Sequence, residues 1–136
     1  MSENIDLVKS VLRAYVNDDR DEIERLIADQ FSFTSPYDNQ IDRTSYMTRC
    51  WPNHETTKAI DFIHFFEDGD EVVTSYEITL VSGRKFRNTE ILSVRDGKIS
   101  AIEVFFGWDI PHPAATGKSK DIAEKALGRF GIKSLD

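Results

Sequence analysis

Hydrophobic positions in the first part of the chain recur with the spacing of amphipathic helices. Residues 5–17 predict one helix that ends at Asn17-Asp18 and buries Ile5, Val8, Leu12, Tyr15 and Val16. Asp19 and Glu22 have the spacing of a capping box. They predict a second helix, antiparallel to the first, whose buried face carries Ile23, Leu26 and Ile27.

The next segment predicts a short strand and a third helix. Phe31 and Phe33 alternate with polar residues, and the Pro and Asx residues of 35–39 indicate a turn. Asp42 is positioned to cap the third helix, and Pro52 ends it. The apolar side of this helix carries Tyr46, Met47, Cys50 and Trp51.

From Lys58 onward, β-branched and aromatic residues dominate in runs separated by turns that contain glycine. The runs predict four strands, at residues 60–66, 72–81, 84–94 and 99–108. The turns are short enough to join antiparallel neighbours, which gives a four-stranded meander. No crossover helix and no glycine-rich phosphate loop interrupts it, which excludes a doubly wound nucleotide-binding sheet.

The chain length of 136 residues fits one domain. We expect residues 1–108 to form its body and residues 109–136 a tail that belongs to the same domain. The tail reads as irregular to residue 120, with a short helix from Asp121 that carries Ile122, Ala126, Leu127 and Phe130. Two alternatives stay open. The tail docks, either over the pocket mouth as a lid or onto a partner subunit, or it is a loose chain end without a role.

Turn geometry predicts which residues face each other across the sheet. A two-residue turn at Ser82-Gly83 would place Thr79 opposite Phe86, Glu77 opposite Asn88 and Ser75 opposite Glu90.

Charge selects the register of the next hairpin. A two-residue closure at Asp96-Gly97 would set Glu90 directly against Glu103, which is unfavourable. A type I turn with Gly97 in a bulge instead sets Glu90 against Ile102.

With these registers, one face is apolar with a few polar groups in the middle of its strands, as in small-molecule pockets. It carries Val73, Ser75, Glu77, Thr79, Phe86, Asn88, Glu90, Leu92, Ile102, Val104, Phe106 and Trp108. The other face resembles a dimer interface, with large apolar residues and a charged rim. Alternatively, helices cover this second face and water covers the first. The phase of strand 60–66, and with it the role of His64, stays open.

Together these patterns predict an α+β fold in which a curved antiparallel sheet, a cone or half-barrel, encloses a pocket beneath N-terminal helices packed over its concave face.

Charge and composition exclude several partners. The net charge of −7 and the absence of basic clusters argue against nucleic acid and anionic membrane surfaces. No apolar run approaches the roughly 20 residues of a membrane span. The N-terminus lacks the pattern of a secretion signal, so we expect a cytoplasmic protein.

Cys50 is the only cysteine, so neither a disulfide within the chain nor a cysteine-rich metal site can form. His54 follows four residues later, but Pro52 argues against one helix that presents both as a catalytic pair. No His, Asp or Glu spacing fits a metal template, and we expect neither metal nor cofactor.

The order of elements over residues 5–108 resembles the nuclear transport factor 2-like superfamily. The segments that carry the resemblance are residues 25–31, residues 35–38 and the hairpin of residues 94–99. That superfamily includes ketosteroid isomerases, polyketide-cyclase-like proteins, dehydratases, epoxide hydrolases and members that only bind ligands. Its dimeric habit implies a homodimer through the outer sheet face.

The resemblance to ketosteroid isomerases is partial. The position of their catalytic aspartate falls on Ser35, which cannot act as a carboxylate base. The position of the tyrosine that binds the enolate falls near Val11, and that of the acidic hydrogen-bond donor falls on Glu90.

Glu90 and Glu77 are the candidate catalytic residues. Enclosure by apolar side chains would raise the pKa of Glu90, and repulsion between the two carboxyls would favour one protonated group. The candidate ligand-binding residues are Asn88, Ser75, Ser35, Tyr37, Trp51, Phe86, Ile102, Phe106 and Trp108.

Three functions follow as hypotheses. The first is a homodimeric enzyme that performs cofactor-free isomerisation, cyclisation or dehydration on a small, largely apolar substrate. The second is a ligand carrier or sensor, because Ser35 replaces the expected base. The third is a protein-interaction module that uses the outer face of the sheet.

Overall fold

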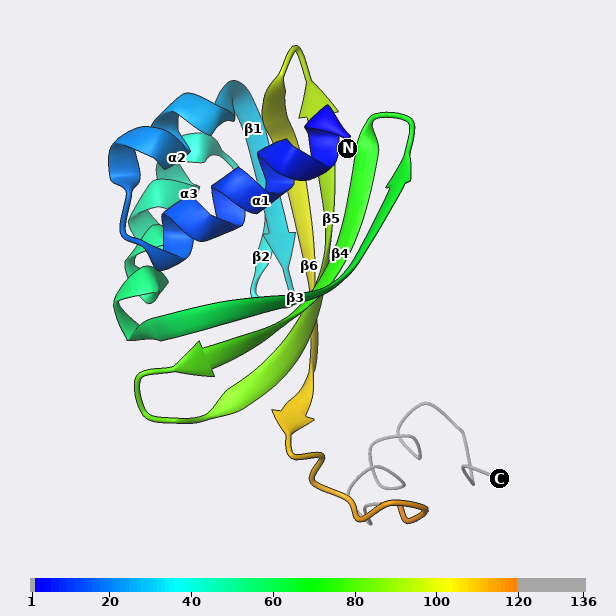
Figure 1. Cartoon of the computed structure of the whole chain (residues 1–136). Coiled ribbons are helices and arrows are strands. Elements are labelled where there is room, and N and C mark those ends of the chain that lie inside the picture. The colour runs from blue at the N-terminus through cyan, green and yellow to red at the C-terminus, as the bar shows by residue number, and fades with distance from the viewer. Residues whose placement is uncertain (1, 120–136) are drawn as a thin grey trace.

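The computed structural model describes residues 2–119 as helices packed on one curved sheet (Figure 1). The helices are α1 (Glu3–Val16), α2 (Arg20–Leu26), α3 (Arg43–Arg49) and the short 3-10 helix η1 (Trp51–Thr56). The strands are β1 (Ile27–Ser35), β2 (Asp38–Ile41), β3 (Thr57–Asp68), β4 (Glu71–Leu80), β5 (Lys85–Arg95) and β6 (Lys98–Ile110).

Side chains at the predicted positions cap the helices. The Asp19 carboxylate accepts from the Glu22 amide at 3.2 Å, and Asp42 accepts from the Ser45 amide at 2.8 Å. Each satisfies one of the amides that a helix N-terminus leaves unpaired. Ile27 was predicted to be helical but begins β1, because α2 ends one residue earlier.

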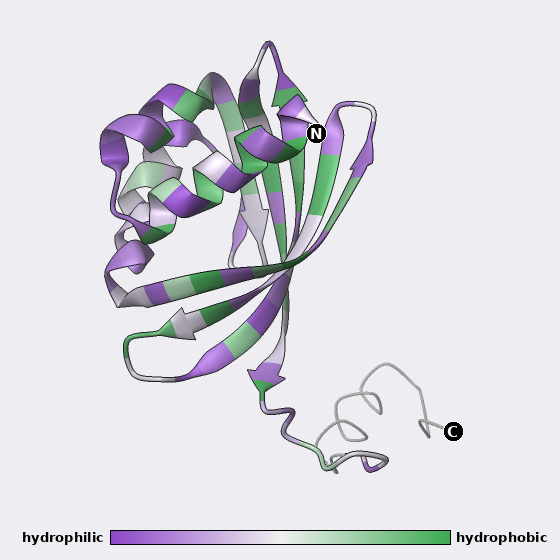
Figure 2. Cartoon of the chain, in the orientation of Figure 1, coloured by the Kyte–Doolittle hydropathy of each residue, from purple (hydrophilic) through white to green (hydrophobic). Residues whose placement is uncertain are grey.

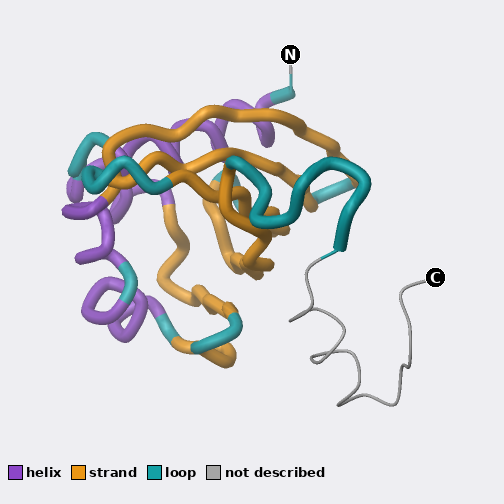
Figure 3. The backbone as a smooth tube through the Cα atoms, turned by 90° about the horizontal axis from the view of Figure 1, so that it is seen from below, coloured by secondary structure: helices purple, strands orange, loops and turns teal. Residues whose placement is uncertain are grey.

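The sheet has the strand order β2-β1-β6-β5-β4-β3. The predicted meander, β3 to β6, forms four consecutive antiparallel strands, and the helices cover the concave side of the sheet (Figures 1 and 3). The predicted α+β fold with a curved sheet is confirmed. Two features go beyond it, since β2 adds an edge strand and β1 pairs with β6 in parallel.

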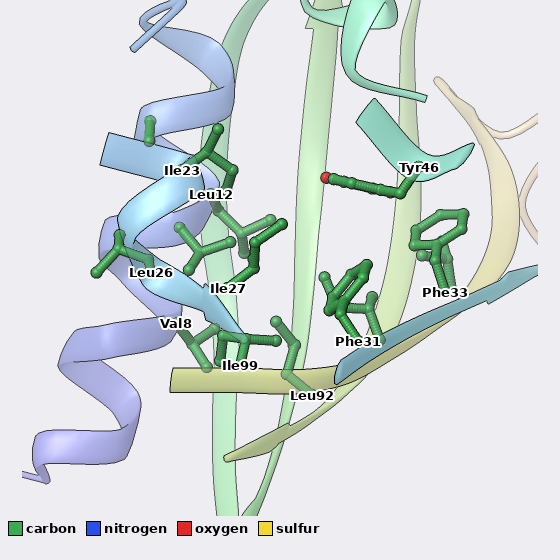
Figure 4. Close-up of a cluster of buried hydrophobic side chains, with 14 of the residues drawn as sticks. Val8, Leu12, Ile23, Leu26, Ile27, Phe31, Phe33, Tyr46, Leu92 and Ile99 are labelled. Carbon is green, nitrogen blue, oxygen red and sulfur yellow. The ribbon is translucent and has the colours of Figure 1, made fainter. Parts of the chain in front are cut away.

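The core lies between the helices and the concave face. Polar and apolar positions alternate along the strands and along α1 (Figure 2). Val8, Ile23 and Ile27 are fully buried against Leu92 and Ile99 (Figure 4). This cluster anchors the helices at one end of the sheet and leaves the other end for the cavity described below.

The β4–β5 hairpin closes differently from the prediction. The Leu80 amide donates to the Arg84 carbonyl at 2.8 Å, so three residues rather than two form the loop. Thr74 therefore pairs with Glu90, Tyr76 with Asn88 and Ile78 with Phe86. The slip of one residue turns β4 over, and Val73, Ser75, Glu77 and Thr79 face away from the concave side.

In the β5–β6 pair, the residues lie on the predicted faces of the sheet, but each residue of β5 has a different partner on β6 from the one predicted. The predicted type I turn with a Gly97 bulge is wrong, because Arg95 pairs with Lys98 across the two-residue turn Asp96-Gly97. A bulge after Ser93 then shifts the register, so Glu90 pairs with Val104 rather than Ile102. Glu103 lies opposite Ile91 on the outer face, so the two carboxyls do not meet.

β6 extends beyond the prediction, through Ile110, and is followed by irregular chain to residue 119. The predicted helix from Asp121 lies outside the described residues. A second bulge lies in β6, where the two residues Gly107 and Trp108 lie opposite the single residue Arg87 of β5. A Cβ atom on Gly107 would lie 2.4 Å from the Arg87 carbonyl oxygen.

We predict that Gly107→Ala lowers the free energy of unfolding by about 1–3 kcal/mol, because one strand must move away from the other. Urea denaturation followed by circular dichroism measures this. Gly117→Ala is the control for backbone strain without a steric contact, since Gly117 has a φ of +77° and a Cβ atom there meets nothing within 4 Å. It should cost about 1 kcal/mol from the left-handed conformation alone, which is less than the loss at Gly107. Equal losses in the two variants would refute the role of close strand approach.

Candidate functional site

A cavity of about 470 Å³ lies between the helices and the concave face of the sheet. Residues of α1, α3 and η1 form one wall, and residues of β1 and β3 to β6 form the other. Its volume and mostly apolar lining suit one small organic molecule.

Glu90 is the buried carboxyl of this cavity. It lies in the middle of β5 and is 4% exposed. Its Oε2 atom is buried and has no hydrogen-bond partner among the described residues. Burial raises the pKa of Glu90 from its ordinary value to about 7, and interaction with the Tyr76 hydroxyl offsets part of that rise. Glu90 can therefore hold or release a proton near neutral pH.

Three tyrosines surround the same region, namely Tyr15 of α1, Tyr46 of α3 and Tyr76 of β4. Burial, and then the nearby Glu90 charge, raises the pKa of Tyr46 and of Tyr76. Burial chiefly raises the pKa of Tyr15 as well. Figure 4 shows the Tyr46 ring reaching from α3 into the space above the sheet. These phenols stay protonated and are hydrogen-bond donors.

Asn88 lies two residues before Glu90 on the same face. Its Oδ1 atom is also buried and without a partner in the described chain. Glu90 and the three tyrosines together form the donor pole of the cavity, and Asn88 adds one acceptor oxygen beside it.

A second polar group lines the cavity around Asp38, at the start of β2. The Asp38 side chain is 9% exposed and pairs with Arg49, whose Nη2 lies 3.1 Å from Oδ1. The Ser35 hydroxyl donates to Asp38 Oδ2 at 2.9 Å, and the Cys50 thiol donates to the same atom from 3.9 Å. Burial raises the pKa of Cys50 to about 11, so the thiol is protonated at neutral pH.

The side of the cavity that opens to solvent carries an ion pair and exposed aromatic rings. Arg84 Nη2 lies 2.8 Å from an Asp109 carboxylate oxygen, and the Arg84 guanidinium stacks 5.3 Å from the Phe86 ring centroid. Tyr37 packs against Phe106 with ring centroids 5.5 Å apart.

Residues 8–102 match the family described as the SnoaL-like domain. The chain belongs to this SnoaL-like family. No curated protein matches the chain at a significant level.

Solved structures share the fold of this SnoaL-like domain. A nuclear transport factor 2-like protein of unknown function from Cytophaga hutchinsonii is 20% identical, with a TM-score of 0.61, 76% of this chain covered and 88% of that one. A putative polyketide cyclase from Sinorhizobium meliloti is 17% identical, with a TM-score of 0.62 and coverages of 74% and 94%. An LEH-like epoxide hydrolase from M. tuberculosis is 22% identical, with a TM-score of 0.64 and coverages of 76% and 82%. The predicted resemblance is confirmed, and these identities show the fold alone.

Most of the predicted site residues of this SnoaL-like domain line one cavity. They are Ser35, Tyr37, Phe86, Asn88, Glu90, Ile102 and Phe106. Sequence reasoning missed Asp38 and the three tyrosines. Asp38 was assigned only to a turn, and the tyrosines come from helices and a strand whose proximity depends on the complete fold.

Four predicted residues do not line the cavity. Glu77 lies on the outer face, where its carboxylate is 3.1 Å from Arg87 Nη2. The Ser75 hydroxyl lies 3.2 Å from that of Thr89, on the same outer face. The hairpin register explains both corrections.

The other two corrections concern tryptophans. Trp51 is 3% exposed and packs in the core, with its ring centroid 5.8 Å from that of Tyr15. Trp108 is 52% exposed and lies within the bulge at Gly107, which turns it away from the cavity.

His64, whose phase the sequence left open, pairs with Ser75 and lies on the outer face. Within residues 2–119, no group of three His, Cys, Asp or Glu side chains could hold a metal ion. In the same range, no helix has the length and apolar character needed to span a bilayer.

The raised pKa of Glu90 predicts a pH dependence of stability. The unfolded chain releases this proton near pH 4.5 and the folded chain near pH 7. The free energy of unfolding therefore falls as the pH rises between these two values. The loss is on the order of 3 kcal/mol. We predict that Glu90→Gln removes this loss, as measured by urea unfolding across that pH range.

Glu103→Gln is the matched control, because Glu103 is exposed on the outer face. It should leave the pH dependence unchanged. A Glu90→Gln variant that follows the wild-type curve would show that Glu90 ionises normally in the fold.

Proposed function

We propose that this protein is an enzyme that binds a small, largely apolar molecule and performs cofactor-free acid–base chemistry on it, of the isomerisation, cyclisation or dehydration type. The observation that carries the proposal is the Glu90 carboxyl, buried in the cavity wall with Oε2 unpartnered. Buried polar groups are otherwise paired, so a ligand is the natural partner of this one.

Glu90 would act first as a donor. Its neutral carboxyl would hydrogen-bond to a substrate carbonyl oxygen and polarise the C=O bond. The protonated tyrosines would add donors to the same oxygen. Because its pKa is about 7, Glu90 could also transfer the proton near neutral pH.

The structural relatives favour small-molecule chemistry in general terms. Two are named as a putative polyketide cyclase and an epoxide hydrolase. The first name matches the cyclisation type, the second is that of a hydrolase, and neither identifies the substrate.

We predict that Glu90→Gln lowers turnover by about 100-fold or more, because amides cannot transfer the proton. Ketones and enones that can isomerise, cyclise or dehydrate would be incubated with the protein and followed by mass spectrometry and nuclear magnetic resonance. Glu77→Gln is the matched control, since Glu77 lies on the outer face, and should retain wild-type turnover. Equal activity of wild type and Glu90→Gln would refute the proposal.

A ligand carrier or sensor is the second candidate, and the position of Ser35 favours it. A serine replaces the expected carboxylate base there, and its hydroxyl is engaged by Asp38 at 2.9 Å. The same incubations separate the two functions. A compound that co-purifies with the protein and stays unchanged over long incubation indicates binding alone.

We also propose a homodimer through the outer face of the sheet, which carries Phe66 and Phe105 at 63% and 53% exposure, with Trp108 nearby on β6. Exposed large apolar side chains on one face favour association.

The predicted effect of Phe105→Glu is dissociation of the dimer, because a carboxylate would be buried at the interface. Sedimentation velocity would measure the species present. Glu103→Gln, on the same strand and face, should remain dimeric. A wild-type protein that stays monomeric at high concentration would contradict the proposed dimer.

A further inference from the structure

We infer that the ligand of this cavity is a neutral compound with a carbonyl group at one end and a hydroxyl group at the other, and that Asp38 Oδ2 accepts the hydrogen bond of that hydroxyl. This inference deepens the proposed function and rests on it for the carbonyl end. The hydroxyl end depends on a different set of residues.

The two polar groups of the cavity lie across β6 from each other. Thr34 pairs with Glu103 on one side of β6, and Glu90 pairs with Val104 on the other. Ser35, whose hydroxyl donates to Asp38, therefore lies at the same position along the sheet as Glu90, with β6 between them. Two strand spacings separate Ser35 from Glu90, which is about 10 Å.

The two poles have opposite hydrogen-bonding character. The pole at Glu90 offers donors from the neutral carboxyl and the phenols, and the Asn88 Oδ1 beside them is an acceptor. Asp38 beside Arg49 is a carboxylate and only accepts. A ligand that satisfies both poles must accept at one end and donate at the other.

Asp38 retains an acceptor position for a ligand. Its Oδ1 accepts from Arg49 Nε at 3.1 Å and lies 3.1 Å from Arg49 Nη2 in the same ion pair. Its Oδ2 accepts from the Ser35 hydroxyl at 2.9 Å. The only other donor to Oδ2 among the described residues is the Cys50 thiol, at 3.9 Å. Thiols are weak donors, whereas a hydroxyl donates to a carboxylate at about 2.5–2.7 Å. A ligand hydroxyl would therefore be a better partner for this oxygen.

The charges around the cavity indicate a neutral ligand. Among the described lining residues, the charged types are Asp38, Arg84, Glu90 and Asp109. Arg49 compensates Asp38, and Arg84 compensates Asp109. Glu90 is neutral when it carries its proton. A charged ligand would lose its hydration without gaining an unpaired counter-charge.

The wall between the poles is apolar. Phe33 of β1 and Ile102 and Val104 of β6 line the cavity there. The body of the ligand, between its two oxygens, is therefore hydrocarbon, aromatic or alicyclic.

Three related probes test the hydroxyl pole. They are para-hydroxybenzylideneacetone, its para-methoxy ether and unsubstituted benzylideneacetone, which share a ketone and differ only in the para substituent. Affinities would be measured by calorimetry below the pKa of Glu90. We expect the hydroxy compound to bind about tenfold more tightly than either of the others, because only it donates to a carboxylate.

Asp38→Asn should abolish this tenfold preference, because its amide nitrogen would face the ligand hydroxyl without accepting from it. Cys50→Ala should keep the preference, since it removes only the weak thiol donor. Binding of unsubstituted benzylideneacetone to each variant reports whether the cavity is intact. If Asp38→Asn loses all binding, Asp38→Glu provides a second carboxylate variant, and its restored preference would support the inference.

Equal affinity for the three probes, or a hydroxyl preference that survives in Asp38→Asn, would overturn the inference. Tighter binding of para-carboxybenzylideneacetone would also overturn it, because Asp38 should repel an anion. Failure of the proposed function has a different signature. In that case Glu90→Gln would bind and turn over every ketone as the wild type does, while the dependence on Asp38 would be unaffected.

Discussion

The three-residue closure of the β4–β5 hairpin determines what the cavity contains. The bond from the Leu80 amide to the Arg84 carbonyl places Tyr76 and Thr74 on the concave face and turns Glu77 outward. One carboxyl therefore remains on this part of the sheet, surrounded by phenols and apolar side chains. A closure shorter by one residue would place Glu77 on the same face as Glu90, and two carboxyls would then share the concave side.

The sequence predicted the elements well and the register only in part. Helix caps at Asp19 and Asp42 act over three residues, so local patterns identify them. The turn at Ser82-Gly83 allows two closures of similar length, and burial over the whole strand decides between them. The set Val72, Thr74, Tyr76, Ile78 and Leu80 is more apolar than its alternate, a signal that the turn-based prediction did not weigh.

Residues brought together from distant segments were beyond sequence reasoning. Asp38 becomes part of the site because α3 supplies Arg49 and Cys50 beside it, and no local spacing links them. Glu90 was identified because Phe86, Leu92, Ile102 and Phe106 were predicted to enclose it on one face of the sheet. The site thus combines a carboxyl whose pKa is raised by burial with one that is paired with an arginine, and these two environments give the same chemical group different hydrogen-bonding roles.

The parallel pairing of β1 with β6 also constrains the order of assembly. β3 to β6 can form by successive hairpins, each between neighbours in the chain. The wall that holds Ser35 and Asp38 instead requires a strand made more than sixty residues later. On the ribosome, the first helices and β1 must wait for β6, so the cavity is among the last features to form, and its long-range contacts slow folding relative to the hairpins.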